Sequence, residues 1–400
     1  MVLKTAASVM AFLLLQLPTS TLGTKATNTN KEPRIVDLSQ DIPQDEAAIA
    51  TSPGAAAIQE AALQDPLVRA VIVLEDGDIV SSYYRDDVDP KRGFFNVHSV
   101  TKSWMSLLLG IMVKEGLLSL DETLSDIFPD DNAWADVIDG SIDFRKSVTV
   151  EEMLTMTSGL VDDAAIPMGG RKIDINQHIK QRKQFASAIC YGGCDFEGSL
   201  SFPGIGVKGE FSYLNFSNIP SYIIQERTGM TPRQYLAEHV MGYLGIGEDE
   251  YDWPQNDDGV EIAFNEMLLT PMQMAKFGQL YLQGGRTNPS NGECVISQEW
   301  IDASFTEQTI GTVGGNRFPH GYLFYNAWGS AWCAIGAAGQ AVCVDHDLGR
   351  VVIQQRDVDG SGFEKFLVPP TALDGSLSFR AGGGDSDGVL GSSPVSVEEY

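Results

Sequence analysis

Short runs of β-branched and apolar residues lie towards both ends of the chain, and longer helical patterns lie between them. The runs within residues 67–84 flank the turn sequence Asp76-Gly77, which predicts a β-hairpin. The runs within residues 341–354 predict a second hairpin. Residues 99 to about 285 show mostly helical periodicity, interrupted by glycine-rich loops. Strands at both ends with helices between them predict an antiparallel sheet that is completed late in the chain and carries a helical insertion.

One helical pattern begins at a serine and carries a lysine three residues later. Residues 94–98 have an extended pattern, and the apolar stretch from Ser99 to Glu115 predicts a helix. Ser99 and Lys102 then lie one turn apart on the same face, where the lysine amine can take the proton of the serine hydroxyl. The first turn of a helix also favours a developing negative charge. The alternative is that Ser99 merely caps the helix, and for an isolated Ser-x-x-Lys sequence that alternative is the commoner one.

Two further segments can supply groups to the same chemistry. Tyr213 and Asn215, just before an apolar helical run, can present a phenol and an amide to one site. A phenol beside a lysine ammonium should lose its proton more easily and act as a general base or acid, although a buried tyrosine with a satisfied hydroxyl is the alternative. Gly336 and Ala337 are small, so a backbone N–H there can approach closely and complete an oxyanion hole with the N–H of Ser99. Taken alone, that segment is better explained as a tight turn into a strand.

The composition narrows the choice of partners. Of the 400 residues, 27 are basic and 54 are acidic, which gives a net charge of −27. So acidic a chain repels nucleic acid and anionic membrane surfaces, and neither is expected as a partner.

Five cysteines permit two disulfides, with Cys190–Cys194 and Cys333–Cys343 as the short-range pairings. The five histidines are dispersed without the spacing of a zinc protease, and no metal site is expected.

The N-terminus has the layout of a secretory signal peptide. Lys4 precedes an apolar stretch at residues 9–17, and small residues follow up to Gly23. This layout predicts a signal peptide at residues 1–23 and a secreted, extracellular protein. An uncleaved membrane anchor is the alternative.

The remaining composition predicts the domain organisation. Residues 24–60 are polar and alanine-rich and are expected to form a leader or linker. Residues 371–400 are rich in Gly, Ser and Asp and are expected to form a disordered tail. The residues between, 61–370, are expected to form one domain with its helical insertion at roughly 111–285.

Five segments, taken in their order along the chain, resemble motifs of the serine β-lactamase-related hydrolases. This group holds class C β-lactamases, penicillin-binding DD-peptidases and related esterases. The likeness covers about residues 67–357, and the segments are 99–104, 148–160, 213–229, 269–285 and 299–300. Met156 and the pair Gly339-Gln340 are most similar to the branch of 6-aminohexanoate-dimer hydrolases and related esterases.

The resemblance implies an α/β (α+β) fold of the β-lactamase/transpeptidase type. In this sandwich an antiparallel sheet is flanked by helices, and a mostly helical subdomain is inserted. Ser99 would lie at the junction of the two parts and attack a carbonyl carbon to form an acyl-enzyme. Lys102 and Tyr213 would share the proton transfers, and Asn215 would orient Lys102 or the substrate. Water would then release the acyl group, so no metal or cofactor is implied.

One departure from the family pattern concerns the substrate. The third family motif usually begins with a Lys or His that helps to bind a substrate carboxylate, whereas residues 333–335 supply no cation. A small ester or amide is therefore expected rather than a penicillin-like substrate. The loops at 161–210 and 305–320 are expected to form the pocket. Tyr322 and Trp328 are candidates for its lining, with core packing as the equal alternative.

Two other functions stay open at this point. One is β-lactamase or D-amino-acid peptidase (DD-carboxypeptidase) activity, and the other is a non-catalytic, penicillin-binding-like sensor or scaffold. The presence of Ser99, Lys102 and Tyr213 together disfavours the non-catalytic role. The sequence does not indicate the oligomeric state.

Overall fold

The computed structural model describes residues 33–45, 47, 60, 62–129, 137–138, 141–142, 144–159, 208–213, 218–256, 259–290, 294–313 and 316–357. The expected signal peptide at 1–23, the expected tail at 371–400, the pair Cys190–Cys194 and Asn215 lie outside these residues, as does most of the expected leader. Among the helices that are described, none combines the length and the apolar character needed to cross a membrane.

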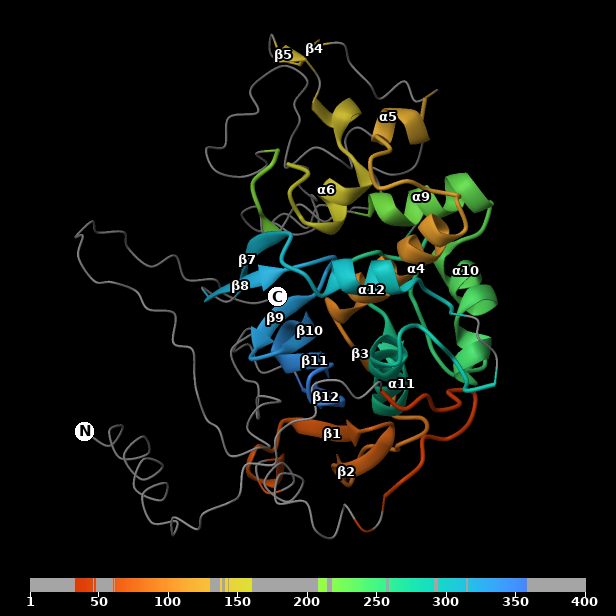
Figure 1. The fold of residues 1–400 in the computed structure, drawn as a ribbon, viewed down its shortest axis with the longest axis vertical. Helices are drawn as coiled ribbons and strands as arrows, with labels where there is room; N and C mark the ends of the chain where they lie inside the picture. Colours follow the sequence, from red (N-terminus) through yellow and green to blue (C-terminus); the bar gives the residue numbers. More distant parts are fainter. Residues whose placement is uncertain are drawn as a thin grey trace, which may run out of the picture. The chain divides into compact units, whose positions relative to one another are not determined.

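An eight-stranded antiparallel sheet has the strand order β2-β1-β12-β11-β10-β9-β8-β7 (Figure 1). Its strands are β1 (Val68–Glu75), β2 (Asp78–Tyr84), β7 (Thr309–Val313), β8 (Asn316–His320), β9 (Tyr325–Trp328), β10 (Ala331–Gly336), β11 (Gln340–Asp345) and β12 (Arg350–Arg356). β1 pairs with β12, with Val73 opposite Val352, so the early and late strands of the domain meet inside the sheet. The expected fold, an antiparallel sheet completed late in the chain, is confirmed.

Both predicted hairpins are present. β1 and β2 pair around Asp76 and Gly77, whose φ angles of +50° and +84° give the left-handed turn that Asp-Gly favours. β11 pairs with β12 to form the second hairpin. Residues 309–313 and 316–320, which fall in an expected pocket loop, instead form the paired strands β7 and β8. The run at 309–313 is rich in Thr, Ile and Val, which favour a strand, and this explains the difference.

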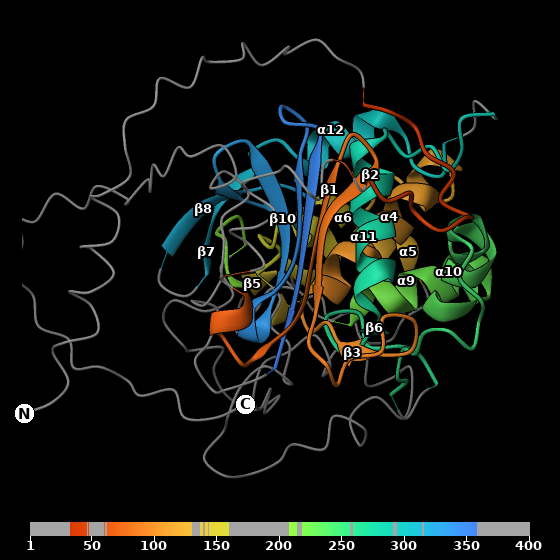
Figure 2. The ribbon, with the colours of Figure 1, turned by 90° about the horizontal axis from the view of Figure 1, so that it is seen from below.

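The predicted helix after Ser99 is α4 (Val100–Lys114), and together with α11 (Pro271–Leu282) it lies against one face of the sheet (Figure 2). α11 packs closely, because a Cβ atom at Gly278 would lie 2.5 Å from a methyl carbon of Val351. α12 (Gln298–Ser304) reaches α4 through Trp300, whose indole would lie 2.7 Å from a Cβ atom at Gly110. α4 is therefore buried on nearly all sides, which explains why its sequence is apolar all round.

Threonine caps begin four of the described helices. Thr123, Thr149, Thr231 and Thr270 each form a reciprocal capping box with the acidic or amide side chain three residues later. The helices that follow them are α5 (Leu124–Ile127), α6 (Val150–Leu154), α10 (Pro232–His239) and α11. The other short elements are α9 (Ile219–Thr228), β3 (Phe95–Asn96) paired with β6 (Leu268–Leu269), β4 (Val137–Ile138) paired with β5 (Ser141–Ile142), and the 3₁₀ turns η1 (Phe144–Ser147), η5 (Met241–Leu244) and η6 (Ala337–Gly339).

A disulfide and the packing of an N-terminal segment strengthen this arrangement. Cys333 and Cys343 lie opposite each other on β10 and β11 and form a disulfide, as one of the short-range pairings predicted. Residues 33–45, which fall in the expected leader, pack onto the domain. The backbone N–H and C=O of Val36 both hydrogen-bond to the side-chain amide of Gln283, at 3.1 Å each, and Leu38 is fully buried.

Candidate active site

Ser99 lies where strand β3 passes into helix α4. The preceding residue, His98, has a φ of +49°, which turns the chain between the two elements. Ser99 occupies the N-cap position of α4, but its side chain accepts no capping hydrogen bond from the helix. Its hydroxyl instead accepts a hydrogen bond from Nζ of Lys102 at 2.8 Å. Helix capping therefore does not account for this serine, and the spacing of Ser99 and Lys102 gives the contact that was predicted from it.

The amine of Lys102 is buried at the meeting point of three oxygen atoms. Besides Oγ of Ser99, Nζ lies 3.3 Å from the hydroxyl of Tyr213 and 3.0 Å from the carbonyl oxygen of Phe264. The lysine is only 6% exposed. The Phe264 carbonyl can only accept, so it fixes one N–H of the amine and orients the rest of the group towards the serine and the phenol. The lysine is thus positioned to exchange protons with both hydroxyl groups.

Tyr213 reaches Lys102 from a segment that is held by the 148–160 motif. The backbone N–H of Ser212 donates to the carbonyl of Met156 at 3.0 Å, and that of Gly209 donates to the carbonyl of Thr157 at 2.7 Å. Met156 itself has a φ of +56°, which marks a sharp turn at this position. The segment that resembled a family motif therefore serves to place the phenol.

The pKa of Tyr213 moves in the direction opposite to the one expected. Burial raises it to about 12, because a phenolate is poorly solvated there, and the hydrogen bond with Ser99 offsets only part of this effect. The sequence indicated the neighbouring lysine but not the burial. At neutral pH the phenol keeps its proton, which suits it to donate a proton to a leaving group rather than to act as a phenolate base.

A side-chain network that the sequence analysis missed supports the strained residue before Ser99. Oδ1 of Asn96 accepts a hydrogen bond from the backbone N–H of His98 at 2.7 Å, and Nδ2 of Asn96 donates to Glu266 at 3.2 Å. The first contact is an Asx turn, for which an asparagine two residues earlier is a recognisable signal. The Phe264 carbonyl was also missed, and it left no signal because any residue supplies a backbone oxygen.

The end of β10 lies against the backbone of Ser99. A Cβ atom at Gly336 would lie 2.4 Å from the carbonyl oxygen of Val97 and 3.2 Å from the backbone nitrogen of Ser99. Gly336 has an extended conformation, so the glycine is required by space rather than by φ. Ala337 follows it at the start of the turn η6. The structure therefore brings the segment predicted to complete an oxyanion hole next to the N–H of Ser99.

The remaining predicted site residues are not brought to this point. Tyr322 is 3% exposed, its hydroxyl donates to Glu151 at 2.7 Å, and its ring packs against Trp300 with the ring centres 5.1 Å apart. These are the contacts of a core residue. Trp328 pairs with Ala331 between β9 and β10, and its side chain, like Asn215, lies outside what the structure describes.

The start of the third motif carries no cation in the structure. Cys333 is in the disulfide, and Ala334 and Ile335 are buried. Within the described part of the chain, no group of three or more histidine, cysteine or acidic side chains is arranged to hold a metal ion.

Comparisons with known proteins show the family and the fold of the chain. The model of the β-lactamase family matches residues 53–363. No curated protein matches the chain. Among solved structures, a putative 6-aminohexanoate-dimer hydrolase from Bacillus anthracis is 16% identical over 86% of this chain and 87% of its own, with a TM-score of 0.56. A family VIII carboxylesterase is 17% identical over 79% of this chain and 95% of its own, with a TM-score of 0.55.

A putative β-lactamase from Bacteroides dorei DSM 17855 is 14% identical over 83% of this chain and 97% of its own, with a TM-score of 0.58. At these identities the structural likeness establishes a shared fold. The family match covers most of the chain and includes the Ser99–Lys102 pair, the Tyr213 segment and the end of β10. The chain therefore belongs to the β-lactamase family and is a serine hydrolase.

Proposed function

We propose that this serine hydrolase cleaves small esters or amides through an acyl-enzyme on Ser99. The observation that carries the proposal is the position of Lys102, whose buried Nζ lies 2.8 Å from the hydroxyl of a serine that does not cap its helix. A serine hydroxyl is a weak nucleophile until a neighbouring base removes its proton, and a buried amine at hydrogen-bond distance can do so.

In the acylation step, neutral Lys102 accepts the proton of Ser99 while Oγ bonds to the substrate carbonyl carbon. The N–H groups of Ser99 and of Gly336 or Ala337 stabilise the oxyanion, and such a donor typically contributes about 3 kcal/mol. Tyr213 gives its phenolic proton to the leaving alcohol or amine as the C–O or C–N bond breaks. Tyr213 then takes the extra proton of Lys102, so the amine is neutral again and the acyl group remains on Ser99.

In the deacylation step, water attacks the ester carbonyl carbon and Lys102 accepts a proton from it, directly or through Tyr213. The bond between the acyl carbon and Oγ of Ser99 breaks, and Lys102 returns the proton to the serine. The acid product leaves and the starting protonation is restored. Asn215 is proposed to orient Lys102 or the substrate during these steps.

The charges of the chain support a substrate without a carboxylate. Residues 333–335 carry no cation. The net charge of −27 also disfavours the approach of an anionic substrate. The similar structures include proteins named as a family VIII carboxylesterase and as a putative 6-aminohexanoate-dimer hydrolase, which agrees with ester or amide chemistry.

The test is hydrolysis of p-nitrophenyl acetate and p-nitrophenyl butyrate by the full chain and by Ser99→Ala. Ser103→Ala is the matched control, because Ser103 lies one turn further along α4 and bonds to the carbonyl of Leu323 instead of to Lys102. Turnover that is lost in Ser99→Ala and kept in Ser103→Ala supports the proposal. Equal rates in Ser99→Ala and the wild type contradict it. If the wild type cleaves a chromogenic lactam or a D-amino-acid amide faster than either ester, the proposed substrate class is wrong and that compound indicates the correct one.

A further inference from the structure

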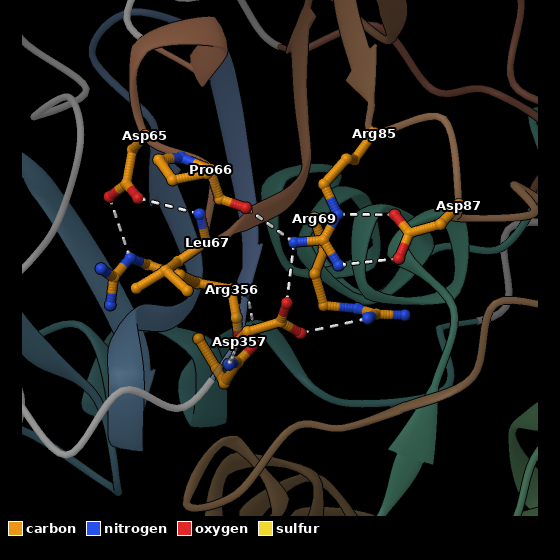
Figure 3. A network of polar contacts seen from close by, with 9 residues as sticks. Asp65, Pro66, Leu67, Arg69, Arg85, Asp87, Arg356 and Asp357 are labelled. Carbon is orange, nitrogen blue, oxygen red and sulfur yellow. Dashed lines mark hydrogen bonds and ion pairs between the residues drawn. The ribbon is translucent and has the colours of Figure 1, made fainter.

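A buried arginine contacts the turn η6, which follows the end of β10 that lies against Ser99. Arg356, the last residue of β12, is 1% exposed. Its Nε donates to Oδ2 of Asp65 at 3.1 Å, and its Nη1 donates to the carbonyl oxygen of Ala338 at 3.3 Å (Figure 3 draws the Asp65 contact). Burial of a guanidinium is costly unless a carboxylate and further acceptors compensate for the lost water. Asp65 supplies the charge, and the turn η6 supplies one of the acceptors.

That turn has an unusual backbone. Ala338 has a φ of +60° and Gly339 a φ of +92°, so two successive residues are left-handed. Glycine adopts this conformation freely, but alanine is strained in it and keeps it only where the surroundings enforce it. These two residues follow directly on Gly336 and Ala337, the residues proposed to donate to the oxyanion. The contacts that hold Ala338 and Gly339 in this conformation therefore also orient the backbone N–H groups of Gly336 and Ala337.

Three buried side chains hold the turn to the end of β12. Arg356 binds the carbonyl of Ala338, and Nε2 of Gln354 donates to the carbonyl of Gly339 at 2.7 Å. Gln340, which is fully buried, accepts a hydrogen bond from the backbone N–H of Arg356 at 3.2 Å and donates one to its carbonyl. The carbonyls of the two left-handed residues, Ala338 and Gly339, are thus each bound by a side chain from the same strand.

The end of β12 is itself fixed to the neighbouring strands. Asp357 accepts hydrogen bonds from Nη1 of Arg69 at 3.1 Å and from Nη1 of Arg85 at 2.7 Å, and Arg85 also pairs with Asp87 (Figure 3). The backbone N–H of Asp357 donates to the carbonyl of Leu67 at 2.8 Å. The backbone beside Arg356 is therefore held in place, and its guanidinium bridges Asp65 and the Ala338 carbonyl.

We propose that Arg356 is a positioning residue for the oxyanion hole, with Asp65 as its counter-ion. It acts by holding the Ala338 carbonyl so that the preceding N–H groups face the serine. This inference rests on the proposed function. Oxyanion donors contribute mainly in the transition state, so a misplaced turn should lower kcat and leave KM almost unchanged.

The test compares Arg356→Met with the wild type on p-nitrophenyl acetate, at a temperature where thermal melting shows both proteins folded. The expected result is a kcat lowered about tenfold or more with KM within about twofold, as for partial loss of an oxyanion donor. Phenylboronic acid, which forms a tetrahedral adduct with a nucleophilic serine, should bind more weakly by a similar factor. Arg350→Met is the matched control, because Arg350 is a buried arginine at the opposite end of β12 that pairs with Glu75 at 2.7 Å; its kcat and boronate affinity should not change.

If Arg356→Met does not fold, the same measurements are made on Arg356→Lys. The lysine keeps the positive charge beside Asp65 but loses the planar group that also binds the Ala338 carbonyl. A kcat and a boronate affinity that equal the wild-type values in the folded Arg356 variant would overturn the positioning role alone. Wild-type turnover that does not depend on Ser99 would overturn the proposed function, and the positioning role with it. The two failures are therefore distinguished by Ser99→Ala measured in the same series.

Discussion

Replacement of His320 by phenylalanine should make the stability of the protein less sensitive to acid. His320 ends β8 and is fully buried, and its ring lies 5.2 Å from the ring of Phe211 and 4.6 Å from that of Tyr325. Within the described structure neither of its ring nitrogens has a hydrogen-bond partner. Burial lowers its pKa from 6.5 to about 3, because the charged imidazolium would have neither water nor a counter-ion.

The size of the effect follows from the two pKa values. The unfolded state, with a pKa near 6.5, binds a proton at mild acidity, whereas the folded state binds one only near pH 3. Stability from this group is therefore complete above about pH 6.5 and is lost as the pH falls from there to about 3, by about 1.4 kcal/mol per pH unit. Between pH 7 and pH 4, His320 should lower the free energy of unfolding by about 3 kcal/mol.

The assay is urea unfolding of the wild type and His320→Phe at pH 7, 5.5 and 4, followed by tryptophan fluorescence. Other titrating groups are common to both proteins and cancel in the comparison. The wild type should lose about 3 kcal/mol more than the variant between pH 7 and pH 4. An equal loss in both proteins would refute the reasoning, since it would mean that His320 is protonated without cost in the folded state.

Three further predictions concern the site. Gly336→Ala should lower kcat about 100-fold or more, because its Cβ atom would meet the Val97 carbonyl at 2.4 Å and displace the oxyanion turn; steady-state rates near wild type would contradict this. Asn96→Ala should lower both kcat and the free energy of unfolding, the latter by about 1–2 kcal/mol, since it releases His98, whereas Glu266→Gln leaves the contact between Asn96 and His98 in place and should retain more of both. Tyr213→Phe should lower kcat without changing the shape of the pH–rate profile between pH 6 and 10, because burial raises the pKa of this phenol to about 12; a basic limb near pH 8 that disappears in the variant would argue for a phenolate instead.

Local patterns explain what could be predicted from the sequence. The hairpin at Asp76-Gly77 depends on a two-residue turn, and the helix after Ser99 depends on one uninterrupted apolar stretch. The contact between Ser99 and Lys102 follows from helical spacing alone. The approach of Gly336 to the serine was predicted from small residues, although its partner in space is far away along the chain.

Tertiary contacts explain what could not be predicted. The rise in the pKa of Tyr213 comes from burial by segments that are distant in the sequence. The carbonyl of Phe264 is a backbone group and has no signature among side chains. The ion pair between Asp65 and Arg356 joins residues 291 positions apart, and no pattern in a single sequence links them.

The central claim, that Ser99 is an activated nucleophile, is tested most directly by covalent labelling of the full chain with a fluorophosphonate. Trypsin cleaves after Arg92 and Lys102 and releases the peptide 93–102, in which Ser99 is the only serine. Mass spectrometry should find the adduct on this serine in the wild type, and Lys102→Met should label at least about 100-fold more slowly because the base is missing. An unlabelled peptide 93–102, or labelling of the protein that persists unchanged in Ser99→Ala, would contradict the account.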